Sequence, residues 1–276
     1  MSDAGDLSRS ATAPDLTLRY GDLPDQVADV RLPPDKGPRP LVVVVHGGFW
    51  KAEFDRAHAG PQSVGLADAG YVVATVDYRR VGQPGGGWPG TFDDLAALTD
   101  AVPELVKTAL PDRVDTTRTV LVGHSAGAHL AAWAAARHRL PNESPWHRSD
   151  PLDVSVVSLA GVLDLELSER LGLGGHAASL LLGGSPRHQR DRYALANPTA
   201  LLPTGVRLIA VHGTGDDTVP VEMSRRYVDR ALAAGDQVEL VEIDDCGHYE
   251  VIDPASAAWP AVLAAIERQA QPVPHL

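Results

Sequence analysis

Residues 119–129 read Thr-Val-Leu-Val-Gly-His-Ser-Ala-Gly-Ala-His, an apolar run that passes through a tight turn into an alanine-rich run. Ser125 stands at the turn, with Gly123 and Gly127 two residues away on either side. A serine between two such glycines is typical of a sharp strand-to-helix turn that exposes the serine as a nucleophile. Larger residues at the glycine positions would collide with the adjoining strand and helix. The segment predicts this turn, although a motif this short also arises by chance.

The rest of the chain repeats the alternation of buried strand and helix. Continuous apolar, β-branched runs are typical of strands covered on both faces. The strand-like runs are 41–45, 71–76, 119–122, 154–159, 206–211 and 237–243. The helical runs are 58–69, 92–110, 126–139, 221–234 and 254–269. This order predicts right-handed βαβ units and an α/β fold with a mostly parallel, doubly wound sheet and helices on both faces.

Three segments lie outside this alternation. Residues 16–20 and 26–32 alternate weakly, which predicts an antiparallel strand pair at one edge and brings the sheet to about eight strands. Residues 1–14 are expected to be a flexible lead-in, and 15–276 a single domain. Residues 163–203 form a long insertion between two predicted strands. Such an insertion is expected to form a small cap over the active site, with plain surface structure as the alternative.

Composition and charge narrow the class of function. The chain has 276 residues, of which 44% are hydrophobic, and a formal net charge of −12. This charge argues against nucleic acid or an anionic membrane surface as a partner, and no run approaches the roughly 20 apolar residues of a membrane helix. The single cysteine, Cys246, excludes an intrachain disulfide and a cysteine-based metal cluster. The N-terminal segment lacks the apolar core of a signal peptide, so a cytoplasmic protein of unknown oligomeric state is expected.

A serine hydroxyl acts as a nucleophile only with a base, a carboxylate to orient that base, and donors for the oxyanion. The run 206–211 leads into Val-His-Gly-Thr-Gly-Asp-Asp, where either Asp216 or Asp217 can supply the carboxylate on spacing alone. His248 follows the next predicted strand. The chain order of serine, acid and histidine, each after a strand, favours a catalytic triad.

A glycine-rich segment after the first long strand can supply the oxyanion donors. It reads His46-Gly47-Gly48-Phe49-Trp50. Backbone amides at such a strand end can converge with the amide of Ala126, the residue after the nucleophile.

Taken together, these motifs resemble the α/β-hydrolase superfamily over roughly residues 38–270. HGGFW resembles the oxyanion signature of HGG-type carboxylesterases, lipases and kynurenine formamidases, and GHSAGAHLA is similar to their nucleophile segment. The resemblance implies Ser125, Asp216 and His248 as the catalytic triad and the amides of Gly48, Phe49 and Ala126 as the oxyanion hole. It also favours Asp216 over Asp217, which is expected to cap the following helix. Phenylalanine stands where hormone-sensitive lipases have a third glycine, which favours the formamidase-like branch.

Other polar and aromatic residues near these motifs have simpler explanations. His46 and His124 are expected to hold loops through hydrogen bonds, since one base is enough. Trp50, Trp88 and Tyr249 are candidates to line the substrate pocket, with packing as the alternative. Cys246 is expected to be a small buried filler. No His-Glu-x-x-His is present, so no metal and no cofactor are expected.

Three functions follow from the sequence, in order of preference. The first is a serine hydrolase that cleaves carboxylic esters with small or medium acyl chains through an acyl-enzyme. The second is an arylformamidase or related amide hydrolase acting on an N-formylkynurenine-like substrate. The third is a non-catalytic binding protein on a hydrolase scaffold, which a missing triad residue would have indicated. The first two take a small-molecule ester or amide as the partner.

Overall fold

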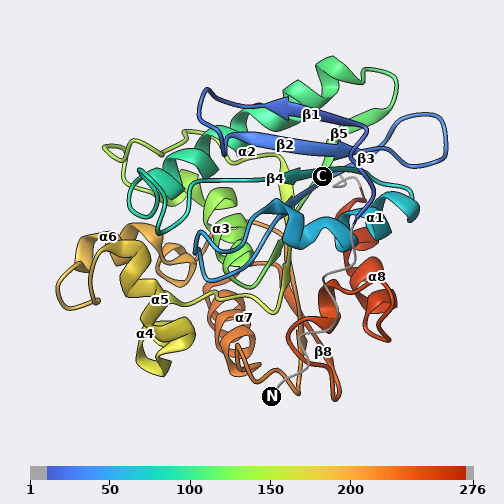
Figure 1. Cartoon of the computed structure of the whole chain (residues 1–276). Coiled ribbons are helices and arrows are strands. Elements are labelled where there is room, and N and C mark those ends of the chain that lie inside the picture. Colours follow the sequence, from blue (N-terminus) through green and yellow to red (C-terminus); the bar gives the residue numbers. More distant parts are fainter. Residues whose placement is uncertain (1–10, 272–276) are drawn as a thin grey trace.

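The computed structural model describes residues 11–271 and is organised around one mixed sheet (Figure 1). Within these residues the strands lie in the order β1-β2-β4-β3-β5-β6-β7-β8. The strands are β1 (Leu16–Arg19), β2 (Val27–Arg31), β3 (Arg39–Val45), β4 (Val72–Val76), β5 (Val114–His124), β6 (Val154–Leu159), β7 (Leu208–Gly213) and β8 (Val238–Ile243). β1 and β2 form the antiparallel edge, and the strands from β4 to β8 are parallel. The predicted mostly parallel sheet with an antiparallel edge pair is confirmed.

Helices cover both faces of the sheet, because the central strands are apolar on both sides. The α-helices are α1 (Gly60–Asp68), α2 (Gly90–Ala109), α3 (Ala126–Ala135), α4 (Leu165–Leu171), α5 (Leu173–Leu182), α6 (Arg190–Ala196), α7 (Glu222–Ala234) and α8 (Trp259–Gln269). Along β3, Val43 and Val45 belong to the core under α2, α3 and α7. Val42 and Val44 belong to the core under α1 and α8. This alternation is the period of two that a strand imposes on its side chains.

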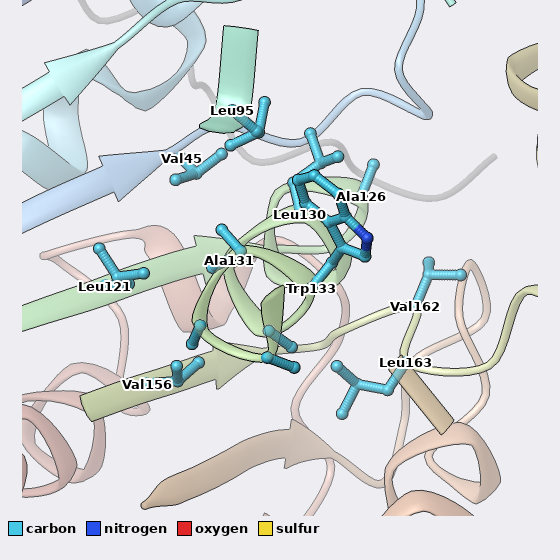
Figure 2. Close-up of a cluster of buried hydrophobic side chains, with 14 of the residues drawn as sticks. Val45, Leu95, Leu121, Ala126, Leu130, Ala131, Trp133, Val156, Val162 and Leu163 are labelled. Atoms are coloured by element: carbon cyan, nitrogen blue, oxygen red, sulfur yellow. The ribbon is translucent and has the colours of Figure 1, made fainter. Parts of the chain in front are cut away.

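Helix α3 lies directly on the sheet behind Ser125. Every residue of α3 is buried, and most of them are alanines. Figure 2 shows Leu130 and Trp133 of this helix among Val45, Leu121 and other sheet residues. Small side chains let the helix backbone approach the strands closely, and that approach fixes the position of the turn at its N-terminus.

The insertion at 163–203 folds into α4, α5 and α6, followed by a 3-10 turn at Pro198–Leu201. Figure 1 shows the three helices grouped on the side of the molecule away from α8. Lys51 Nζ donates a hydrogen bond to the Gly174 carbonyl oxygen at 3.0 Å, so the insertion is tied to the segment after β3. That it caps the active site stays a prediction.

Several boundaries differ from the sequence prediction. Strand β5 begins at Val114, five residues before the predicted run, and α8 begins at Trp259 because residues 254–258 form turns. The predicted lead-in at 1–14 falls mostly outside the described residues. Among the residues that are described, no helix has both the length and the apolar character needed to cross a membrane.

Candidate active site

Ser125 lies in the turn between β5 and α3, at the carboxyl end of a central strand. Its backbone has φ 53° and ψ −117°, a conformation that residues other than glycine rarely adopt. A Cβ at Gly123 would lie 2.4 Å from Ala128 Cα, and one at Gly127 would lie 2.0 Å from the Val45 carbonyl oxygen. The two glycines are therefore a steric requirement of the turn, as predicted.

Asp216 and His248 meet at the ends of β7 and β8. His248 Nδ1 lies 2.7 Å from Asp216 Oδ2, and both side chains are buried. Burial by itself would raise the pKa of Asp216, but hydrogen bonds from His212 and His248 hold the pKa of this carboxyl well below its usual range. Asp216 is therefore an ionised acceptor that can orient the imidazole of His248.

His124 connects the histidine loop to the nucleophile. Its Nε2 donates a hydrogen bond to the His248 carbonyl oxygen at 3.0 Å, and the two rings lie 4.7 Å apart between centroids. Burial and the neighbouring His248 lower the pKa of His124 well below its usual value, so its ring is neutral. Because His124 directly precedes Ser125, these contacts place His248 next to the serine turn. Across residues 11–271 no hydrogen bond joins Ser125 Oγ to His248, a bond that commonly tightens only with substrate in place.

The segment after β3 is the second strained turn beside Ser125. Gly48, Phe49 and Trp50 have φ values of 101°, 51° and 58°, three consecutive residues in the left-handed region. A Cβ on Gly47 would lie 3.2 Å from Ser125 Cβ, so the backbone of this segment passes directly against the serine. In the described part of the chain, the amides of Gly48, Phe49 and Ala126 donate no hydrogen bond to another residue. They are the residues that the resemblance implies as oxyanion donors.

A buried network of ion pairs and hydrogen bonds contacts the segment 46–50. The Asp77 carboxylate pairs with Arg80, lies 3.1 Å from His46 Nε2 and lies 3.3 Å from Arg56 Nη1. His46 in turn has Nδ1 2.8 Å from the Gly47 carbonyl oxygen. Tyr78 stacks on the His46 ring at 4.5 Å and donates its hydroxyl to the His46 carbonyl oxygen. His46 therefore holds the segment in place, as expected for a structural histidine.

The three aromatic residues that were candidates for the substrate pocket have different surroundings in the structure. Trp50 has no exposed surface and donates its ring N–H to His129 Nδ1 at 3.2 Å, so the expectation that it lines the pocket is corrected to packing. Trp88 is half-buried against Phe92 and Trp146, in the aromatic core beneath α2. Tyr249 is half-buried with its ring 5.1 Å from that of His248, and its contact with substrate stays a prediction.

Two expectations about the loops after β7 and β8 have different outcomes. Asp217 does not cap α7: the helix begins at Glu222 with Val221 at the cap position, and Asp217 is exposed in the preceding turn. It is Asp216 that closes this turn, by accepting the backbone N–H groups of Thr218 and Val219. Cys246 is buried, as expected, and burial raises the pKa of its thiol to about 11. A thiol with this pKa is a poor nucleophile at neutral pH.

Three side chains around the site were not predicted from the sequence. His212 Nε2 lies 3.2 Å from Asp216 Oδ2, and His58 and Phe54 lie at the outer edge of the His124–Tyr249 group. The pattern His-Gly-x-x-Asp contained the signal for His212, since it places a histidine at the end of the same strand. His58 and Phe54 carried no such signal, because only the tertiary fold brings them to this site. Among the described residues, no group of three His, Cys, Asp or Glu side chains could hold a metal ion.

The order of the sheet and the position of the Ser125 turn at its centre define an α/β-hydrolase. The model of the BD-FAE family matches residues 28–230, and the chain belongs to this family of esterases. The family assignment agrees with the resemblance drawn from the sequence motifs.

The individual relatives share low sequence identity with this chain. Isoprenylcysteine alpha-carbonyl methylesterase of Arabidopsis thaliana is 30% identical over 244 residues, which cover 82% of this chain and 54% of that protein. Kynurenine formamidase of Danio rerio is 25% identical over 89% of this chain and 78% of that protein. The chain spans little more than half the length of the first curated relatives that it matches.

Solved structures share the fold. A truncated carbohydrate esterase from gut microbiota superposes with a TM-score of 0.77 at 19% identity, covering 95% of this chain and 97% of that one. Propionate-bound esterase 2 of Thermogutta terrifontis superposes with a TM-score of 0.70 at 22% identity, covering 97% and 96%. At these identities the structural likeness concerns the fold alone.

Proposed function

We propose that the chain is a carboxylesterase that cleaves esters of small or medium acyl chains through Ser125, His248 and Asp216. The observation that carries the proposal is the buried Asp216–His248 hydrogen bond beside the strained turn of Ser125. In this proposal His248 takes the proton of Ser125 as the hydroxyl attacks the ester carbonyl, and Asp216 holds the imidazole in the required tautomer. His248 then gives the proton to the leaving alcohol, which leaves Ser125 acylated.

Water completes the cycle in a second step. His248 takes a proton from a water molecule, which attacks the acyl-enzyme, and returns this proton to Ser125 Oγ as the bond to the acyl group breaks and the carboxylic acid leaves. Both steps pass through an oxyanion, and the unused amides of Gly48, Phe49 and Ala126 are its proposed donors. Each donor of this kind typically stabilises the transition state by about 3 kcal/mol. Because the turns that carry these amides are closely packed at Gly47 and Gly127, the amides need little reorganisation at the moment of reaction.

The proposed size of the acyl group rests on the contact between Phe49 and the insertion. A Cβ at Gly174 would lie 2.5 Å from the Phe49 ring, so the ring and the backbone at the start of α5 touch. In the proposal the insertion is a cap, and this contact limits the space beside the oxyanion donors. Structures of the Thermogutta esterase with propionate and with butyrate bound agree with short acyl groups on the same fold.

The formamidase alternative has its own support. Among the relatives described above, Danio rerio kynurenine formamidase is the one that this chain covers most fully. The half-buried ring of Tyr249 beside His248, and that of Phe54 against Gly48, would suit an aromatic amine as the leaving group. The mechanism would be the same, with formamide in place of ester.

Parallel assays on the same preparation test both candidates. Nitrophenyl esters from acetate to decanoate and N-formylkynurenine are offered to wild type and to Ser125→Ala. We expect hydrolysis of acetate, propionate and butyrate esters at rates that fall with longer chains, and none of these activities in Ser125→Ala. Preferred turnover of N-formylkynurenine would select the formamidase. Wild-type rates in Ser125→Ala would rule out both candidates.

A further inference from the structure

Four N–H groups face the Asp216 carboxylate, and one of the two that come from side chains, that of His212, has no part in the triad. Oδ1 accepts the backbone N–H groups of Thr218 at 2.9 Å and Val219 at 2.8 Å. Oδ2 faces His248 Nδ1 at 2.7 Å and, on its other side, His212 Nε2 at 3.2 Å. Every lone-pair direction of the carboxylate is therefore taken. His212 is the penultimate residue of strand β7 and has no exposed surface.

The neighbours of His212 decide which of its ring nitrogens carries the proton. Nε2 lies 2.8 Å from the Val219 carbonyl oxygen as well as 3.2 Å from Asp216 Oδ2, and both of these oxygens are acceptors. Nε2 must therefore bear a hydrogen, which it donates to the Val219 carbonyl oxygen while lying within 3.2 Å of Asp216 Oδ2. Nδ1 lies 2.7 Å from Ser224 Oγ on α7, and this hydroxyl can donate to it. Ser224 is also completely buried, so water does not compete for this bond.

We infer that His212 is a positioning residue for the acid–base pair, with Ser224 selecting its tautomer. The Nε2–H of His212 holds Asp216 Oδ2 so that its remaining lone pair faces His248 Nδ1. Without this donor the carboxylate keeps the two backbone contacts on Oδ1 but can rotate Oδ2 away from His248. The inference rests on the proposed function, since it assumes that the imidazole of His248 serves Ser125.

His212 acts only through Asp216. It has no exposed surface, and Asp216 Oδ2 stands between it and His248. Proton transfer from His212 to substrate is therefore excluded by access. In a low-dielectric interior, an N–H group interacts more strongly with a charged carboxylate than it does in water. The N–H group of His212 can therefore restrict the rotation of the Asp216 carboxylate.

Two substitutions that introduce amide side chains distinguish the contact made by Nε2 of His212 from the contact made by Nδ1. The side-chain nitrogen of His212→Gln reaches the position of Nε2 and can still donate to Asp216. The side-chain amide of His212→Asn ends at the position of Nδ1, so it keeps the Ser224 side and loses Asp216. The probe is p-nitrophenyl acetate, and the concentration of reactive sites is counted by titration with a phosphonate ester.

We expect kcat per reactive site to fall about 10- to 100-fold in His212→Asn, the usual cost of losing an orienting partner, with KM unchanged. His212→Gln should recover most of this loss. A role in folding alone would lower the number of reactive sites in both variants and leave kcat per site at the wild-type value. Either that result, or equal kcat losses in the two variants, would overturn the inference.

A second variant decides the question if His212→Asn does not fold. Ser224→Ala removes the donor to Nδ1 and frees His212 to move its proton there, so kcat should fall with KM unchanged. In the Asp216→Asn background, Ser224→Ala should add little, because the carboxylate through which it acts is gone. Full additivity would contradict the inference. If Ser125→Ala hydrolyses the ester, the proposed function fails; if Ser125→Ala is inactive while His212→Asn and Ser224→Ala keep wild-type kcat, only the role of His212 fails.

Discussion

Two loops flank Ser125, and they are held in place by different means. The loop of His248 is fixed by the hydrogen bond between its side chain and the Asp216 carboxylate and by the one that the neutral His124 ring donates to its backbone carbonyl oxygen. The segment 46–50 rests on a buried ion network centred on Asp77. We therefore expect mutations in the two loops to have different effects. Substitutions around His248 should remove catalysis and leave the fold intact. Substitutions beneath the segment 46–50 should first lower the free energy of unfolding.

The largest effect is expected at the acid of the histidine side. Asp216→Asn keeps the oxygen that accepts the backbone N–H groups of Thr218 and Val219 but presents an amide to His248, which then adopts the wrong tautomer. We predict a loss in kcat of about 10⁴-fold, with a cooperative melting transition retained. Steady-state kinetics on p-nitrophenyl acetate and a melting curve check both parts.

Asp217→Asn is the matched control for this substitution. Asp217 is the adjacent residue, carries the same charge and is exposed, so its variant should keep wild-type kcat. Loss of activity in Asp217→Asn with activity retained in Asp216→Asn would exchange the two roles.

The next effect is expected beneath the oxyanion segment. Burial by itself would raise the pKa of Asp77, but the hydrogen bond and charge of His46, with Arg80, lower it below its usual range. Asp77→Asn leaves the buried guanidinium of Arg80 without this partner, and we predict a loss in unfolding free energy of about 3–5 kcal/mol. Urea titration measures this loss at pH 7, where the stabilisation of the ionised form is fully present. It should decline as the pH falls from about 4 towards the lowered pKa of Asp77.

A surface pair provides the control. Asp35→Asn removes the exposed partner of Arg39, and its stability should stay within about 0.5 kcal/mol of wild type. Similar losses in the two variants would show that the network around Asp77 does not support the oxyanion segment more than an ordinary surface pair does.

The smallest effect concerns the neutral link between the oxyanion segment and α3. His129 accepts from Trp50 and donates to the Ala196 carbonyl oxygen, and burial lowers its pKa to about 4. Because its pKa in the unfolded chain is near 6.5, the unfolded state binds a proton between these two values that the folded state does not. Wild type therefore loses stability as the pH falls from about 6.5 to 4, by up to roughly 1.4 kcal/mol per pH unit for this residue.

His129→Gln removes this titration and should flatten the stability curve by that amount. Urea midpoints at pH 4.5, 5.5 and 6.5 compare the two proteins. Parallel curves would mean that His129 is charged in the folded protein, which its two contacts do not allow.

The sequence predicted the parts of the fold that depend on local patterns. Continuous β-branched runs marked the central strands, and Gly123 and Gly127 marked the Ser125 turn, because both follow from steric rules that act over a few residues. The partners of single side chains could not be predicted in the same way. Trp50 was a pocket candidate until the fold placed it against His129, seventy-nine residues further along the chain. Asp77 and His46 likewise meet only through the pairing of β3 with β4.

The position of the nucleophile is the central claim, and covalent labelling tests it most directly. Wild type is incubated with a fluorophosphonate, digested, and analysed by peptide mass spectrometry. We predict one modified residue, Ser125, with labelling abolished in Ser125→Ala and esterase activity lost in step with label incorporated. Modification of a different residue in step with lost activity, or esterase activity that persists after Ser125 is fully labelled, would contradict it.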